Sequence, residues 1–168
     1  MYVRNNTAFI DGQNLYLGTK EAGWSISHAR FRTYLKDKYG ISRAYYFLGY
    51  RSDKESLLYY RLQQAGFILV FKEHSSVAIS HKKGNVDVDI VFSSMKELID
   101  STPGKIFIVS GDGDYYRLIA YLIEKGRFGK ILFPNKKFAS YLYKYLITEY
   151  YDFLDDAMVR SKIEIMHN

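Results

Sequence analysis

The sequence of 168 residues contains no cysteine, which excludes disulfide scaffolds and zinc sites built on cysteine. Its four histidines show no metal-ligand spacing, and its only two prolines, Pro103 and Pro134, fall where we expect loops. No apolar run is long enough to cross a bilayer, and the first residues lack the apolar core of a signal peptide. We therefore expect a cytoplasmic protein with no membrane association.

The composition is that of a globular protein, with 48% apolar and 25% charged residues. We find no internal repeat, low-complexity tract or linker, so residues 1–168 are expected to form a single domain. The formal net charge of +6 favours an anionic partner. The 17 tyrosines are suited to packing in strands, although tyrosine also stacks on nucleic-acid bases.

Short apolar runs alternate with segments of helical periodicity along the whole chain. We expect strands over residues 7–11, 43–50, 67–73, 105–110, 130–134 and 151–155. We expect helices over residues 27–39, 53–65, 86–99, 114–125 and 136–147, and another helix directly after the first strand. Residues 74–84 have no period and are expected to form a loop. This alternation predicts an α/β fold with a parallel sheet and helices on both faces.

Three acidic clusters stand next to the ends of predicted elements. Asp11 closes the first strand, Asp112 and Asp114 follow the strand at 105–110, and Asp87 lies near the start of a helix. The carboxyl ends of parallel strands share one rim, where ligands bind, and carboxylates gathered there need a cation between them. Mg²⁺ or Mn²⁺ would meet that need. For Asp11 and for the first Asp of "GDGD", helix capping and turn formation are an equally ordinary explanation.

Helix geometry separates Asp87 from its neighbour Asp89. The apolar residues of helix 86–99 lie on one face and are expected to pack on the sheet: Val88, Val91, Phe92, Met95, Leu98 and Ile99. At about 100° per residue, Asp87 lies beside this stripe and Asp89 lies on the solvated side. We therefore expect Asp87 to reach the site, and Asp89 to act only as a charge near the helix N-terminus.

The three clusters lie in motifs that together resemble the NYN domain, a branch of the PIN-like nucleases, and in particular its LabA-like members. The motifs are "FIDGQNLY", "KGNVDVDIV" and "IFIVSGDGDYYRLI", and the resemblance runs from about residue 7 to residue 154. It implies a PIN-like three-layer sandwich with a mainly parallel sheet, and a metal-dependent endoribonuclease that uses Mg²⁺ or Mn²⁺. It also implies a set of catalytic residues, of which the four aspartates would bind metal: Asp11, Asp87, Asp112, Asp114, Asn14 and Ser110.

The sequence departs from the common form of the last motif at three positions. Gly113 stands where Ser is frequent. Tyr115 and Tyr116 stand where the family usually has one aromatic residue next to a small one. The acidic set is intact in spite of these changes. Asn14 would hold a water and Ser110 would orient a carboxylate, unless they serve only in capping and turn formation.

The expected substrate is RNA, taken as a single strand. Basic side chains near the same rim would hold its phosphates without reading its sequence, although each of them could equally be a solvated surface residue. These residues are Arg51, Lys82, Lys83, Lys136 and Lys137. His81 directly precedes Lys82 in the same loop.

Two other functions stay open on the sequence alone. The first is a catalytically weak or inactive NYN module that binds RNA or a protein partner. The second is a metal-dependent phosphatase or other phosphoryl-transfer enzyme with a small substrate. Retention of all four carboxylates argues against the first, and the basic charge together with the absence of a phosphate-gripping Gly-Lys loop argues against the second. Homo-oligomerisation is also left open.

Overall fold

Six parallel strands form the central sheet in a computed structural model, which describes residues 5–73, 86–101 and 103–166. The strands are β1 (Asn6–Asp11), β2 (Ile41–Leu48), β3 (Ile68–Phe71), β4 (Ile106–Val109), β5 (Phe128–Phe133) and β6 (Tyr151–Phe153). Their order across the sheet is β3-β2-β1-β4-β5-β6, and every neighbouring pair is parallel. All six strands expected from the sequence are present.

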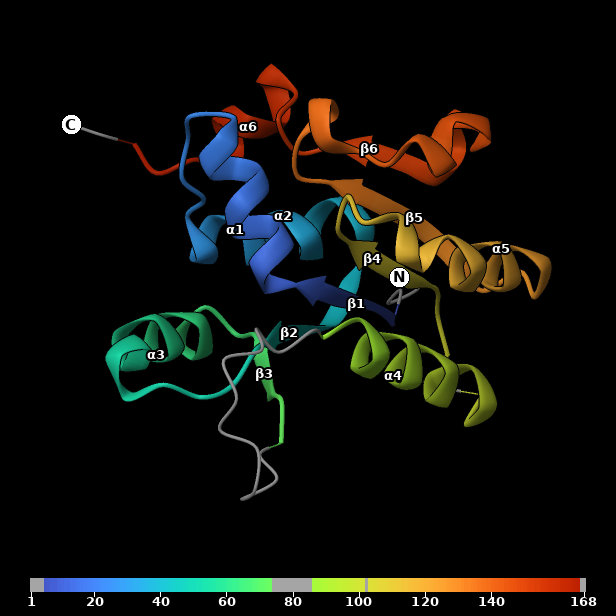
Figure 1. The fold of residues 1–168 in the computed structure, drawn as a ribbon, viewed down its shortest axis with the longest axis horizontal. Helices are drawn as coiled ribbons and strands as arrows, with labels where there is room; N and C mark the ends of the chain where they lie inside the picture. Colours follow the sequence, from blue (N-terminus) through green and yellow to red (C-terminus); the bar gives the residue numbers. More distant parts are fainter. Residues whose placement is uncertain (1–4, 74–85, 102, 167–168) are drawn as a thin grey trace.

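Helices cover both faces of this sheet (Figure 1). They are α1 (Gly12–Glu21), α2 (His28–Tyr39), α3 (Ser56–Gln64), α4 (Asp87–Ile99), α5 (Tyr116–Glu124) and α6 (Ala157–Ile163). Short 3₁₀ segments complete the fold: η1 (Asp53–Glu55), η2 (Gly113–Tyr115), η3 (Lys136–Phe138), η4 (Tyr141–Tyr145) and η5 (Thr148–Tyr150). None of the helices in the described ranges is long and apolar enough to cross a membrane.

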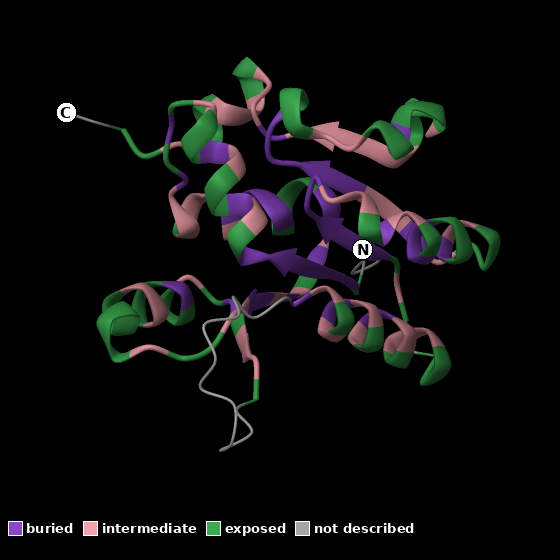
Figure 2. Ribbon diagram, viewed as in Figure 1, coloured by how far each residue is buried: buried purple, intermediate pink, exposed green. Residues whose placement is uncertain are grey.

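The strands are buried because their side chains alternate between two apolar cores. On β1, Ala8 and Ile10 point into the core that α1, α2 and α6 cover, whereas Phe9 points into the core beneath α4 and α5. Figure 2 shows the central strands buried between the two helical layers. The predicted three-layer α/β sandwich is therefore confirmed.

The strand order reverses between β1 and β4. The chain builds outward from β1 through β2 to β3, then crosses through α4 to β4 on the other side of β1. In parallel sheets the carboxyl ends of two such strands part to leave a crevice, and ligands bind there. The acidic residues after β1 and β4 therefore stand at the place where this fold most readily forms a site.

The segment from residue 136 to residue 147 is not the helix that its spacing predicts, but two short 3₁₀ turns. The side chains of Asn135 and Ser140 accept hydrogen bonds from the backbone N–H groups of Lys137 and Leu142, at 2.9 and 3.3 Å. Such local side-chain bonds compete with the continuous backbone ladder of an α-helix. The prediction also missed α6, whose N-cap is Asp156.

The apolar stripe predicted for α4 is wrong in part, because the helix is rotated about its axis. Its fully buried residues are Ile90 and Ser94, while Val88, Phe92 and Ile99 are 73%, 68% and 74% exposed. Polar contacts to the sheet explain this rotation. The Glu97 carboxylate accepts a hydrogen bond from Thr7 on β1 and pairs with Arg43 on β2 at 3.1 Å, which turns part of the apolar stripe toward solvent.

Candidate metal centre

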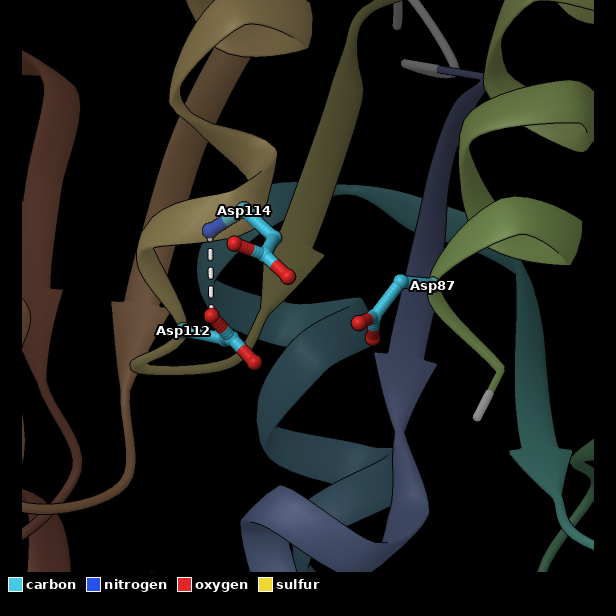
Figure 3. Close-up of side chains that lie close together, drawn as sticks. All are labelled: Asp87, Asp112 and Asp114. Atoms are coloured by element: carbon cyan, nitrogen blue, oxygen red, sulfur yellow. Dashed lines mark hydrogen bonds between the residues drawn. The ribbon is translucent and has the colours of Figure 1, made fainter. Parts of the chain in front are cut away.

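Three aspartates gather at the crevice between β1 and β4. One carboxylate oxygen from each of Asp87, Asp112 and Asp114 lies within 4.8 Å of one from each of the others. Figure 3 shows Asp87 pointing from the start of α4 toward the other two, which lie on the loop after β4. Three carboxylates this close together make a candidate cation site from residues that the sequence places in two separate motifs.

The loop after β4 fixes Asp112 and Asp114 through its own hydrogen bonds. The backbone N–H of Asp114 donates to Oδ1 of Asp112 at 3.0 Å, so that Asp112 is the N-cap of η2. The N–H of Asp112 donates in turn to Oγ of the buried Ser110 at 3.1 Å. The capping role considered for Asp112 is therefore present, and the capping side chain also belongs to the carboxylate group with Asp87 and Asp114.

Asp11 lies behind the three carboxylates and does not belong to their group in the described part of the chain. It is buried as the N-cap of α1, where its Oδ1 accepts a hydrogen bond from the Asn14 N–H at 3.0 Å. Its Oδ2 faces the hydroxyls of Tyr115 at 3.2 Å and Ser110 at 3.5 Å. Asp11 therefore reaches the cluster through a neighbouring hydroxyl, whereas the sequence suggested a place beside the other carboxylates.

Tyr115 links the two parts of the site, a role that we did not predict from the sequence. Its ring is fully buried, and its hydroxyl lies 2.7 Å from Oδ1 of Asp87 and 3.2 Å from Oδ2 of Asp11. Burial and the Asp11 charge raise the pKa of this hydroxyl well above its usual range, so it stays protonated and donates. One feature of the sequence could have indicated this role: Tyr115 directly follows Asp114 and is the first apolar residue of the helical pattern.

The buried Asp11 carboxylate is costly to ionise. Burial raises the pKa of Asp11 above its ordinary value, and the charges of Asp87 and Asp112 raise it further, against the lowering effect of the Asn14 N–H. Burial is thus a larger cause of this pKa shift than repulsion from the neighbouring carboxylates. A group that is costly to ionise gains from a cation nearby.

Asn14 joins the loops that follow β1 and β4. Its side-chain oxygen accepts a hydrogen bond from the N–H of Gly111 at 2.7 Å, while its own backbone N–H donates to Asp11. Together with Ser110, which lies between Asp11 and Asp112, it fixes how far apart the two loops stand. Both residues thus position the carboxylates.

The basic residues expected near the rim have different surroundings. Arg51 is exposed in the loop after β2, and Lys137 is exposed with its Nζ 5.9 Å from the ring centroid of Phe138. Lys136 is held by Asp156 at 3.7 Å and lies over Phe153. His81, Lys82 and Lys83 lie outside the described residues.

Replacing Tyr115 by Phe is expected to lower the free energy of unfolding by about 1.5–3 kcal/mol, the usual contribution of a hydrogen bond to a charged group. The substitution removes only the hydroxyl between Asp11 and Asp87. Urea denaturation of the variant and the parent would measure the change in the free energy of unfolding. Tyr46→Phe is the matched control, because Tyr46 is also buried but makes no hydrogen bond through its hydroxyl within the described part of the chain. A loss no larger than in the control would contradict the linking role of Tyr115.

The sequence profile of the NYN domain matches residues 7–150 of the chain. The chain belongs to the NYN domain family. The resemblance seen in the three motifs is thereby confirmed over nearly its full extent, while the LabA-like branch stays a prediction. The acidic cluster and the hydroxyls around it lie inside the matched part of this NYN domain.

One solved structure supports the fold of this NYN domain. It is similar to a protein of unknown function from Vibrio parahaemolyticus RIMD 2210633, with a TM-score of 0.72 and 18% identity over 98% of this chain and 99% of that one. It also shares a TM-score of 0.40 and 16% identity with the T5 D15 protein co-crystallised with metal ions, over 68% of this chain and 51% of that one. The second likeness is too weak to support an inference. A search of curated proteins found no match.

Proposed function

We propose that this NYN domain is a metal-dependent endoribonuclease that hydrolyses phosphodiester bonds of single-stranded RNA. One observation carries the proposal: the carboxylates of Asp87, Asp112 and Asp114 lie within 4.8 Å of one another at the crevice between β1 and β4. Membership of a family that resembles the PIN-like nucleases supports it. The net charge of +6 around an acidic site suits a polyanionic substrate.

The donor set fits Mg²⁺ or Mn²⁺. Both are hard ions that take carboxylate oxygens, and two ligand oxygens of one Mg²⁺ stand at most about 4.2 Å apart, twice the usual bond length. The oxygens of the three aspartates lie within 4.8 Å of one another, so small side-chain rotations bring them to such distances. Asp114 is exposed, which leaves the site open on the side from which a substrate would arrive.

In this proposal the chain's own residues position the ion and the substrate. Asp87, Asp112 and Asp114 hold the ion, and Asp11 is the fourth carboxylate of the set, joined to Asp87 through the Tyr115 hydroxyl. When bound, a divalent cation supplies the charge that activates water and stabilises the leaving oxygen.

Basic side chains give the proposed active site its attraction for a polyanion. Arg51 and Lys137 are exposed near the carboxyl ends of β2 and β5, on the same rim of the sheet as the carboxylates. They hold RNA phosphates without reading the sequence of bases. Lys136 contributes less in this proposal, because its ammonium group is already paired with Asp156.

Cleavage of a circular single-stranded RNA tests the proposal. We expect Mn²⁺ or Mg²⁺ to support cutting of the circle, which has no end for an exonuclease, and EDTA to stop it. The same preparations would be offered a generic phosphomonoester, which we expect to remain intact. Fragment sizes on a denaturing gel measure the first reaction, and released phosphate measures the second.

The assay also separates the other functions. Binding of Mn²⁺ and RNA without any cutting would contradict the proposed activity and favour a non-catalytic binding module. Hydrolysis of the phosphomonoester alone would contradict it in favour of a phosphatase. Cleavage that persists in EDTA would show that the carboxylates do not act through a cation.

A further inference from the structure

Two exposed tyrosines and a lysine form a ridge beside the acidic site. Tyr141 and Tyr145 on η4 are 74% and 79% exposed, although both have large rings. The Lys144 ammonium lies over both rings, 3.7 Å from the centroid of Tyr141 and 4.6 Å from that of Tyr145, and it donates a hydrogen bond to the Tyr141 hydroxyl. We call these three residues the tyrosine–lysine ridge.

The ridge is fixed to the loop that carries Asp112 and Asp114. Tyr143, between the two exposed tyrosines, is buried with its ring 5.3 Å from that of Phe133, and its hydroxyl donates to the backbone carbonyl of Asp112. The N–H of Ser140 donates to the carbonyl of Gly111 at 3.0 Å. The ridge therefore stands at a set position relative to the carboxylates.

Gly113 allows this close approach. A Cβ atom at that position would meet Oγ of Ser140 at 2.5 Å, which is closer than such atoms come, and Cδ1 of Leu142 at a tight 3.0 Å, so Ser140 would have to shift. The segment before and within η4 can lie directly against the acidic loop because this residue has no side chain. The 3₁₀ geometry of η4, which the sequence did not predict, then directs Tyr143 inward and its neighbours Tyr141 and Tyr145 outward.

We propose that the tyrosine–lysine ridge binds single-stranded RNA by stacking unpaired bases on Tyr141 and Tyr145, with Lys144 beside a phosphate. The class of ligand rests on the proposed function. Aromatic rings with most of their surface exposed offer faces to which bases of any sequence can stack. The positive charge between them complements the RNA backbone, whereas an apolar protein partner would gain nothing from an ammonium group at that place.

This position selects for unpaired RNA. Bases inside a duplex are already stacked on one another and cannot be reached by rings that project from a protein surface. A strand held on the ridge runs next to Asp112 and Asp114, since the segment before η4 and the acidic loop are joined by hydrogen bonds. The ridge therefore gives the proposed nuclease a preference for single strands.

Binding measured in EDTA tests the ridge independently of cleavage. We expect Tyr141→Ala with Tyr145→Ala to weaken the binding of labelled single-stranded RNA by about 10-fold or more in fluorescence anisotropy, since one stacked base contributes a factor of about 5 at least. The double variant with Phe at both positions should keep the affinity, because it keeps the rings. A control with Leu57→Ala and Tyr60→Ala removes two exposed apolar side chains from α3 and should bind as the parent does.

The possible binding results test the tyrosine–lysine ridge separately from the proposed nuclease activity. Loss of binding in the alanine variant and retention in the phenylalanine variant would support the ridge, even if Mn²⁺ then gave no cleavage. Parental affinity in the alanine variant would overturn it, even if that variant cleaved RNA. Failure of the parent to bind single-stranded RNA, or an equal loss of affinity for duplex RNA in the alanine variant, would also overturn it.

Discussion

Replacing Asp112 by Asn is expected to abolish metal-dependent cleavage of RNA while the protein stays folded. The change removes one of the three charges that would hold the ion, so the rate should fall by about 10²-fold or more, as when one group that stabilises a transition state is lost. Asparagine is as good an N-cap as aspartate, and its side-chain oxygen can still accept the Asp114 N–H. Initial cleavage rates at saturating Mn²⁺ would measure the effect.

The same variant should separate loss of catalysis from loss of stability. Two like charges 4 Å apart repel by about 1 kcal/mol in water, so the metal-free variant should be at least as stable as the parent. Mn²⁺ at 100 times its dissociation constant should stabilise the parent by about 2.7 kcal/mol, and it should stabilise the variant much less. A variant that still cleaves RNA, or that gains as much stability from Mn²⁺, would show that Asp112 is not a ligand.

Asp87→Asn is expected to lose cleavage, whereas Asp89→Asn should keep most of it. Asp87 lies in the carboxylate group and accepts the Tyr115 hydroxyl, but Asp89 is outside that group. Both residues stand in the first turn of α4, so either substitution removes a similar interaction with the helix dipole, about 0.3–1 kcal/mol. The two variants therefore lose a similar dipole interaction, and only Asp87→Asn also changes the charge of the group that accepts the Tyr115 hydroxyl.

Cleavage rates and urea denaturation of the two variants, measured side by side, would check this prediction. Both variants should stay folded, and their cleavage rates should differ widely. Equal loss of cleavage in both variants would contradict it, since it would mean that Asp89 also reaches the ion. An unaffected Asp87→Asn variant would remove this residue from the proposed site altogether.

The sequence predicted the sheet well because its central strands are buried on both faces. Runs such as residues 106–109 are apolar throughout, and few structures other than a central parallel strand accept them. The positions of Asp112 and Asp114 followed from the same reasoning, because parallel strands end at one rim. Asp87 has no strand of its own to place it; helix geometry separated it from Asp89, and the family resemblance then placed it in the acidic set.

Contacts between distant parts of the chain could not be predicted from apolar periodicity or from the ends of strands. The rotation of α4 depends on Glu97 meeting Thr7 and Arg43, three residues that no periodicity relates. The place of Asp11 behind Tyr115 depends in the same way on a hydroxyl that arrives from another segment. Side-chain bonds to the backbone decided η3 and η4, where helical spacing of apolar residues was a misleading guide.

The pairing of β1 with β4 has a consequence for the kinetics of folding. This pairing sets Thr7 beside Ile106, and it closes a long loop of chain whose entropy must be lost before the contact is gained. Asp87 lies on α4, which contacts β1 through Glu97 and Thr7, so it meets Asp112 and Asp114 after β4 only when this loop has closed. An ion therefore finds its ligands only in the completed domain. A bound divalent ion should therefore prolong the lifetime of the folded protein and leave the rate at which it forms nearly unchanged.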